Sequence, residues 1–165
     1  MKTLHLLRHA KSSWSDPNCP DRDRPLNKRG RRDAPLMGAA LSRIVPPVPV
    51  SCSTARRAGL TLEGLCDGWA ELAALRHQRE EALYTFDADE VLAWIMAQDD
   101  RRGELFIIGH NPALTDLANM LCGILVSENI PTAGYVRLGL AIGHWRDAAP
   151  DSARLEQVLL PRSLR

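Results

Sequence analysis

Histidine and arginine side chains stand at three places in this sequence where an apolar segment ends. Arg8 and His9 follow TLHLL, residues 53–57 with two arginines follow PVPVSC, and His110 follows ELFIIG. Arginine presents a planar fork that binds phosphate or carboxylate oxygens in pairs, and histidine acts as a nucleophile or proton carrier near neutral pH. If the three places meet in space, these residue types predict chemistry on a bound phosphate group.

Short apolar runs alternate along the chain with stretches whose apolar residues recur every three or four positions. The first pattern is typical of buried strands and the second of helices packed on a core. We therefore predict strands at residues 3–8, at about 48–52, weakly at 75–78 and at 104–109, and helices over about 34–44, 58–72, 87–98 and 112–121.

Strands that alternate with helices predict βαβ units and a parallel sheet. We expect residues 1–165 to form one α/β domain whose mainly parallel sheet is flanked by helices on both faces. Two later strand-like runs, YVRLGLAI and ARLEQVLL, can pair as a C-terminal hairpin. Ligands of such sheets bind beyond the carboxyl ends of the strands, so the histidines and arginines should meet at one edge.

A long loop and an ambiguous helix start separate the first two strands. Residues 11–27 are rich in Ser, Asp, Pro and Asn, and loops of this length in compact domains are usually functional or mobile. The next helix has two candidate caps. Asn27 as the cap would leave Pro35 to kink the helix, whereas Asp33 as the cap would put Pro35 in the first turn.

Two of the three strand ends also open helices. Asn111-Pro112 is a natural cap and first helical position directly after His110. A helix N-terminus presents unpaired N–H groups and a partial positive charge, both of which favour an anion. The expected helix starts therefore strengthen the prediction of an anion site.

The remaining histidines and one arginine are interpreted as structural. His5, His77 and His144 are expected to be surface or hydrogen-bonded residues, and Arg56 is expected to be a solvated side chain at a helix start. His5 and His9 are four positions apart, but that spacing gathers zinc ligands only on a helix. Because the segment reads as a strand, we reject a zinc hydrolase.

Composition argues against several other classes of protein. The 21 Lys and Arg residues and 20 Asp and Glu residues give a net charge of +1, so neither nucleic acid nor an anionic membrane is expected as a partner. No apolar run reaches transmembrane length. Charged residues interrupt the N-terminal run, whereas a signal peptide needs a longer uninterrupted apolar region. The four cysteines form no C-x-x-C pair and are expected to be reduced thiols. We expect a cytoplasmic protein.

The segments LLRHAKS, RPLNKRG, STARRAGLTLE and IIGHNP occur in this order over residues 4–112, about two-thirds of the chain. Together they resemble the histidine phosphatase superfamily, and within it the SixA-type phosphohistidine phosphatases. LLRHAKS is similar to the RHG signature, with alanine in place of the usual glycine. STARRAGLTLE is similar to the second motif, and this similarity selects Arg57 rather than Arg56 as the functional arginine.

The resemblance implies a phosphoglycerate mutase-like fold and a phosphatase that needs no metal or other cofactor. It implies that His9 is the nucleophile and that Arg8, Arg57 and His110 hold the phosphate. We also expect Asn111 to bind phosphate. A phosphoryl group in transfer carries negative charge on its equatorial oxygens, which two guanidiniums, a helix N-terminus and an imidazole can bind.

Many relatives use a carboxylic acid between the second and third motifs to protonate the leaving group. Glu80, Glu81, Asp87 and Asp89 lie in that region of this chain. We choose Glu81 because it follows the expected third strand, with a solvated loop carboxylate as the alternative interpretation.

The expected function is removal of phosphate from phosphohistidine on a signalling protein, such as a histidine phosphotransfer domain. The chain has no insertion that would cover a substrate, and imidazole, with a pKa of about 6.5, leaves more readily than an alcohol. One alternative is a general phosphomonoesterase that acts on a small phosphate ester, or a protein phosphoserine/phosphothreonine phosphatase. A phosphate-binding module without catalysis is disfavoured because all four central residues are present.

Overall fold

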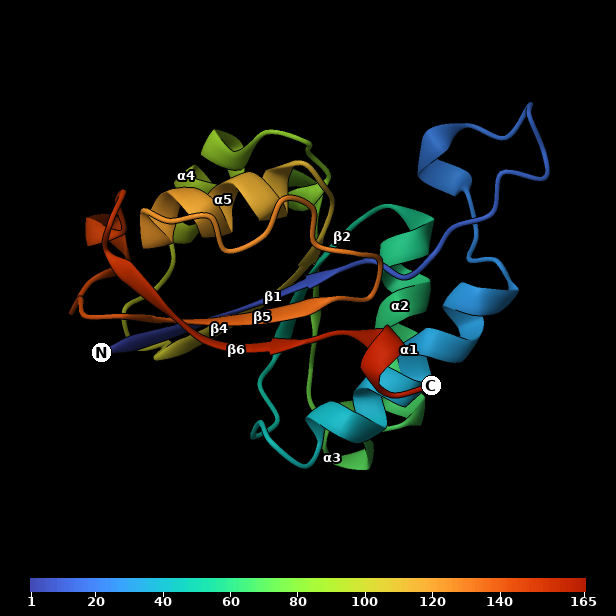
Figure 1. Cartoon of the computed structure of the whole chain (residues 1–165), viewed down its shortest axis with the longest axis horizontal. Helices are drawn as coiled ribbons and strands as arrows, with labels where there is room; N and C mark the ends of the chain where they lie inside the picture. The colour runs from blue at the N-terminus through green and yellow to red at the C-terminus, as the bar shows by residue number, and fades with distance from the viewer.

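Six strands form one sheet, and five helices cover its two faces. The computed structural model describes all residues 1–165, and Figure 1 shows α4 and α5 on one side of the twisted sheet and α1, α2 and α3 on the other. The strands are β1 (Lys2–Arg8), β2 (Val50–Ser53), β3 (Gln78–Glu80), β4 (Glu104–Gly109), β5 (Tyr135–Leu140) and β6 (Ala153–Leu159). The helices are α1 (Lys28–Leu41), α2 (Arg56–Asp67), α3 (Ala70–Ala73), α4 (Ala88–Met96) and α5 (Ala113–Cys122).

The order of strands in the sheet is β3-β2-β4-β1-β5-β6. The first four of these strands run parallel, whereas β5 pairs antiparallel with β1 and β6 pairs antiparallel with β5. The predicted α/β fold, with a mainly parallel sheet and a C-terminal strand hairpin, is confirmed. Since β2, β4 and β1 are neighbours, their carboxyl ends meet at one edge of the sheet.

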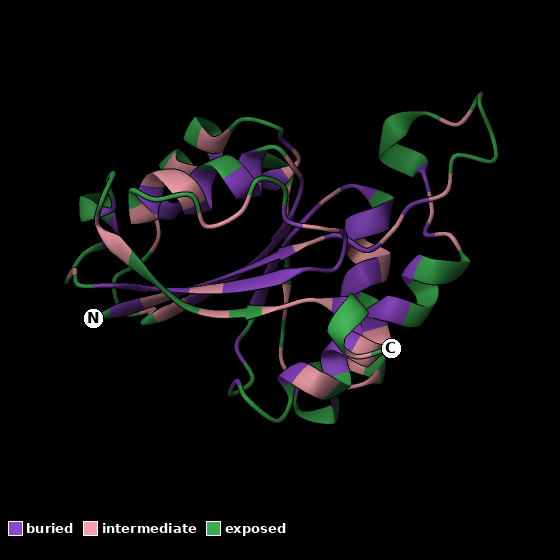
Figure 2. Cartoon of the chain, in the orientation of Figure 1, coloured by how far each residue is buried: buried purple, intermediate pink, exposed green.

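Alternate residues of the central strands enter two separate apolar cores. Leu4 and Leu6 of β1 pack with α4 and α5, whereas Leu7 packs with α1 and α2. Figure 2 shows the central strands buried along almost their whole length. Burial on both faces explains why β1 and β4 are continuous apolar runs rather than alternating ones.

Asn27 caps α1. Its side-chain oxygen accepts a hydrogen bond of 2.9 Å from the N–H of Gly30, and Pro35 lies inside the helix. Of the two helix starts that the sequence allows, the structure has the one at Asn27.

Three boundaries differ from the sequence prediction. β2 begins at Val50 because Pro49 has no N–H to give to the sheet. The weak third strand lies at Gln78–Glu80 rather than 75–78, and His77 before it uses its Nδ1 to accept the Val50 N–H at 2.9 Å. The helical pattern over 58–72 is divided at Gly68 into α2 and α3.

Two of the histidines interpreted as structural are satisfied by side-chain partners. His5 has its Nδ1 2.7 Å from the Tyr135 hydroxyl and its Nε2 2.8 Å from the Glu104 carboxylate. The Nδ1 of His144 lies 2.8 Å from the Asp100 carboxylate. All four cysteines are free thiols. Among the helices, none has the length and apolar character that a membrane span requires.

The loop of residues 11–27 projects beyond the edge of the sheet and folds back on itself (Figure 1). Ser12 forms a bridge with Leu26 at its base. Its one helical turn is a 3₁₀ turn at Asp21–Asp23, which packs against α2. The loop therefore carries this turn to the edge where the strands end.

Glycines let α1 and α2 approach closely. A Cβ on Gly38 would lie 2.2 Å from the carbonyl oxygen of Leu65, and a Cβ on Gly64 would lie 2.5 Å from the Cβ of Ala34. Such distances are shorter than any van der Waals contact, so neither position has room for a side chain. Gly64, which interrupts the helical pattern of α2, is thus a place where the two helices touch.

We expect Gly38→Ala to lower the free energy of unfolding by about 1–3 kcal/mol, because the added methyl group must displace the backbone of α2. Gly103→Ala is the matched control, since a Cβ there meets no atom within 4 Å. Urea unfolding of both variants measures the difference. Equal stability of Gly38→Ala and wild type would show that the helices can separate without cost.

Candidate active site

The carboxyl ends of three strands bring His9, Arg57 and His110 together, a group we call the His9 cluster. His9 follows β1 and His110 follows β4, and the pairing of Arg8 with Gly109 sets the two imidazoles side by side, with ring centroids 5.2 Å apart. Arg57 lies in the first turn of α2, just after β2. The cluster is nearly closed to solvent, since His9 is 7% exposed, Arg57 2% and His110 1%.

His9 is held in one tautomer. Its Nδ1 lies 2.7 Å from the carbonyl oxygen of Ala10, so Nδ1 carries the proton and donates it to that oxygen. The other ring nitrogen, Nε2, keeps its lone pair and accepts from the Nε of Arg57 at 3.3 Å. The atom that can attack an electrophile therefore faces the centre of the cluster.

The hydroxyl of Thr61 ties α2 to the segment that follows β1. Its oxygen accepts from the N–H of Ala10 at 2.9 Å, and its proton goes to the carbonyl oxygen of Arg57 at 2.7 Å. The backbone beside His9 and the first turn of α2 are therefore fixed to one another.

His110 takes the opposite tautomer. Its Nδ1 lies 3.3 Å from Nη2 of Arg57, and since a guanidinium only donates, Nδ1 is the acceptor. The proton is then on Nε2, which donates to the hydroxyl oxygen of Ser53 at 2.7 Å. Ser53 is not among the residues predicted for the site, although its place in STARRAGLTLE, four residues before Arg57, pointed to it.

Both imidazoles of the cluster are uncharged at neutral pH. Burial, together with the nearby His110 and the charge of Arg57, lowers the pKa of His9 to about 3. Burial also lowers the pKa of His110 to about 3, together with the positive charge of Arg57. Neutral imidazole is the form of histidine that can act as a nucleophile.

The guanidinium of Arg57 also binds Asp21, from the 3₁₀ turn of the long loop. Nη1 donates to the Asp21 carbonyl oxygen at 2.7 Å, and Nη2 lies 3.1 Å from the Asp21 carboxylate. Partial burial would raise the pKa of Asp21, but hydrogen bonds from Tyr84 and Arg24 and the charge of Arg57 outweigh burial and lower it to about 2. Asp21 is not among the residues predicted for the site, because nothing in the sequence of an irregular loop indicates which carboxylate will turn inward.

Arg8 has donors that the protein does not use. Its Nη1 donates to the carbonyl oxygen of Ile130 at 2.9 Å, whereas its Nε is buried and has no hydrogen-bond partner. Its charge lowers the pKa of both His9 and His110, so it lies beside the cluster. A buried N–H without a partner is rare in proteins, and an anion at this edge would satisfy it.

Asn111 uses its whole amide group within the protein. The nitrogen donates to Asn129 at 3.1 Å and to the Ile130 carbonyl at 2.8 Å, and the oxygen accepts from the backbone and hydroxyl of Thr115. The geometry thus gives Asn111 a bracing role near Arg8, and it does not favour the predicted contact with phosphate. The helix begins one residue later than expected, at Ala113, with Pro112 as its cap.

Glu81 follows β3 as expected, but its carboxylate binds other partners. Arg22 donates to both of its oxygens, at 2.9 and 2.5 Å, and the hydroxyl of Thr54 donates at 2.6 Å. These hydrogen bonds lower the pKa of Glu81 to about 2, so the group is ionised at neutral pH. A carboxylate in this state ties the loop to the rim of the site, and its geometry does not favour the predicted role of proton donor.

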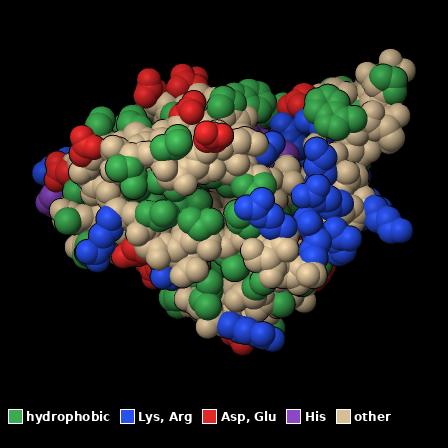
Figure 3. All heavy atoms as spheres, in the orientation of Figure 1, with side chains coloured by type: hydrophobic (Ala, Val, Ile, Leu, Met, Phe, Trp, Pro, Cys, Tyr) green, Lys and Arg blue, Asp and Glu red, His purple; other side chains and the backbone are tan.

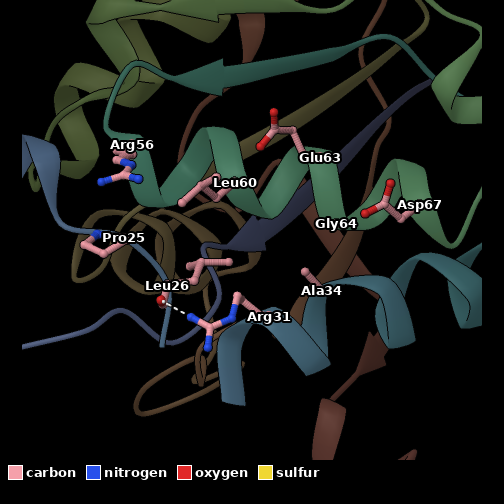
Figure 4. A pocket seen from close by; sticks show the side chains of 9 residues that line it. All are labelled: Pro25, Leu26, Arg31, Ala34, Arg56, Leu60, Glu63, Gly64 and Asp67. Carbon is pink, nitrogen blue, oxygen red and sulfur yellow. Dashed lines mark hydrogen bonds between the residues drawn. The ribbon is translucent and has the colours of Figure 1, made fainter. Parts of the chain in front are cut away.

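Arg56, next to Arg57, points away from the cluster. It lines an open groove of about 500 Å³ between α1 and α2, with Arg31 on the facing helix (Figure 4). No member of the His9 cluster lines this groove. Arg56 therefore matches the solvated side chain that the sequence predicts. No three His, Cys, Asp or Glu side chains come together as metal ligands would.

A model of the histidine phosphatase superfamily (branch 1) matches residues 4–122, a range that includes the whole cluster. An uncharacterized protein of Mycobacterium tuberculosis (strain H37Rv) is 37% identical over 167 residues, which cover 94% of this chain and 100% of that protein.

Solved structures share the fold. The proposed phosphohistidine phosphatase SixA of Nakamurella multipartitia is 26% identical with a TM-score of 0.81, over 97% of this chain and 96% of that one. The protein histidine phosphatase SixA complexed with tungstate has a TM-score of 0.80 at 21% identity, over 99% of both chains.

We expect the free energy of unfolding to fall as the pH drops from 6.5 to 5. In the unfolded chain His9 and His110 bind protons below about pH 6.5, but in the folded protein only near pH 3. The unfolded state therefore holds more protons in this window, and stability decreases as the pH falls. Each histidine accounts for up to about 2 kcal/mol at pH 5.

Urea unfolding at pH 7, 6 and 5 measures this dependence. His9→Gln removes one of the two groups and should flatten it, whereas His144→Gln, at an exposed position, should not. A wild-type stability that stays constant over this range would contradict the assignment of neutral, buried imidazoles.

Proposed function

This chain belongs to branch 1 of the histidine phosphatase superfamily, and from that premise we propose that it removes phosphate from phosphohistidine on a signalling protein. The observation that carries the proposal is the state of the carboxylates around the His9 cluster. Asp21 and Glu81 both have their pKa lowered to about 2, so neither holds a proton for a leaving group at neutral pH. A substrate that needs little help from a general acid suits such a site best.

The first step transfers the phosphoryl group to His9. The free ring nitrogen of the substrate phosphoimidazole first takes a proton from solvent. Nε2 of His9 then attacks phosphorus, and the bond from phosphorus to the substrate nitrogen breaks with its electron pair, so that neutral imidazole leaves. Arg8 and Arg57 bind the equatorial oxygens, where the charge develops. The hydrogen bond from Nδ1 to Ala10 stabilises the positive charge that the phosphorylated ring of His9 acquires.

In the second step, water attacks the phosphorus of phosphorylated His9. The bond to Nε2 breaks and returns its electron pair to the neutral ring, while the proton of the water passes to solvent or to phosphate. Two displacements through a covalent intermediate replace one difficult hydrolysis with two easier reactions. Neutral His9 is then ready for the next substrate.

The leaving group decides which substrates such a site can use. Imidazole has a pKa of about 6.5 and departs readily, whereas the alkoxide from an alkyl phosphate has a basicity near that of hydroxide, about 15.7. General acid catalysis typically contributes roughly 10²–10⁴-fold. Without it, an alkyl phosphate should react more slowly than phosphohistidine by a factor in this range.

The partner in this proposal is a cytoplasmic phosphoprotein, such as a histidine phosphotransfer domain. Lys and Arg side chains gather on the side of the molecule that carries the long loop and the start of α1 (Figure 3). Arg22 in the long loop and Lys28 and Arg31 in the first turn of α1 are exposed. A basic surface beside the site attracts a phosphorylated, acidic protein and orients its approach.

Turnover of four substrates tests the proposal. We expect a phosphohistidine protein to be hydrolysed at least about a hundredfold faster, in kcat/KM, than an alkyl phosphate or a phosphoserine peptide, with a phosphotyrosine peptide in between. His9→Ala should abolish all four reactions and keep its fold. Labelled substrate quenched in alkaline detergent should leave phosphate on wild type and none on His9→Ala.

The other possible outcomes point to different functions. Rapid turnover of small alkyl phosphates would favour a general phosphomonoesterase. Rapid turnover of a phosphoserine peptide would favour a protein phosphoserine/phosphothreonine phosphatase. Label on a residue other than His9 would contradict the proposed mechanism.

The adjacent arginines should differ sharply. Arg57→Ala is expected to lose about a hundredfold or more in kcat, since it removes a donor aimed at transition-state charge. Arg56→Ala, the neighbouring control, should stay within roughly threefold of wild type because its side chain is exposed and outside the cluster. Arg57→Lys keeps the charge but not the fork and should remain slow. The reverse result would assign the phosphate to Arg56.

A further inference from the structure

Two aromatic side chains stand beside His110. The ring centroids of Tyr84 and Phe86 lie 5.5 and 5.6 Å from that of His110, and 6.2 Å from each other in an edge-to-face arrangement. The chain has only two Tyr and two Phe residues. The other two, Phe106 and Tyr135, are fully buried beside His5.

Phe86 is placed where core packing does not explain it. It is 50% exposed, whereas His110 beneath it is 1% exposed, so Phe86 lies on the solvent side of the cluster. Leaving half of a phenylalanine in water forgoes much of the stabilisation that its burial would bring. The exposed part of the ring is a flat apolar surface at the mouth of the site.

Neighbouring groups fix this surface in position. The hydroxyl of Tyr84 donates to the Asp21 carboxylate at 2.5 Å, and the guanidinium of Arg22 lies 5.1 Å from the Tyr84 ring centroid. The backbone between the two aromatic residues is held by Thr85, which is buried and accepts from the N–H of Asp87 at 3.1 Å. Tyr84 and Phe86 thus form a prearranged wall.

We propose that Tyr84 and Phe86 form a subsite for the leaving group, one that takes a flat aromatic or heteroaromatic ring. A phosphoryl group bound to the His9 cluster projects its leaving group toward solvent, which is the side on which Phe86 lies. An imidazole or phenol ring can stack on Phe86 or meet it edge to face, whereas an alkyl chain cannot. A protonated phosphoimidazole is also attracted electrostatically by the ring face.

This inference rests on the proposed function only for the identity of the leaving-group ring. If the proposed function holds, that ring is the imidazole of phosphohistidine. A site without a proton donor for the leaving group still has to select among phosphate compounds. The wall formed by Tyr84 and Phe86 supplies that selectivity. It strengthens binding of substrates whose leaving groups depart unaided, and it gives alkyl phosphates no comparable contact.

The test compares variants of Phe86 on an aryl phosphate, an alkyl phosphate and a phosphohistidine protein. Phe86→Ala should lower kcat/KM for the aryl and phosphohistidine substrates by roughly twofold to tenfold, mainly through KM, and leave the alkyl phosphate within twofold. Phe86→Trp should retain the preference for rings. Ile44→Ala is the matched control, since it also removes an exposed apolar side chain (43% exposed) after the far end of α1.

Each result is expressed relative to wild type with the same substrate, so intrinsic differences between leaving groups cancel. An equal loss on all three substrates, or no loss on any, would overturn the subsite. If wild type does not hydrolyse phosphohistidine but Phe86→Ala still loses its preference for aryl over alkyl phosphate, the subsite stands and the proposed function fails. Thermal unfolding verifies that each variant is folded.

Discussion

Arg57 has a permanent positive charge, and its side chain is only 2% exposed. The groups around it are hydrogen-bond acceptors and one carboxylate, which a buried positive charge requires. A guanidinium cannot give up its proton, so a buried one needs acceptors around it and disfavours a positive charge on the imidazoles that it contacts. His9 and His110 supply lone pairs and remain neutral, and Asp21 supplies the compensating carboxylate. The tautomer of His110, part of the lowering of both histidine pKa values and the position of Asp21 follow from this one placement.

The fold keeps this charge in place through α2. Thr61 links the carbonyl of Arg57 to the backbone beside His9, and the glycine contacts between α1 and α2 leave the helix little room to shift. Asp21 is in turn held by Tyr84, which belongs to the wall at the mouth of the site. Core packing and site geometry are therefore linked by a continuous set of contacts.

The sequence predicted the parts of the molecule that repeat or pair regularly. Apolar periodicity located the strands and helices, and because parallel strands end at one edge of a sheet, His9, His110 and the arginines could be expected to meet there. Asp21 and the aromatic wall were not foreseen, because they come from irregular segments whose direction depends on contacts distant in sequence. Glu81 shows the same limit: its position after β3 was expected, but the pairing with Arg22, 59 residues away, decides its chemistry.

The bond between Asp21 and Arg57 also determines which anions can compete for the site. A chloride ion or a metabolite carboxylate that displaced Asp21 would exchange one monoanion for another and gain little. A phosphoryl group brings more charge and three oxygens, enough to engage Arg57 and the unused Nε of Arg8 together. In the proposed function the loop carboxylate is thus a built-in competitor, which a monovalent anion displaces with little gain and a phosphoryl group displaces with more.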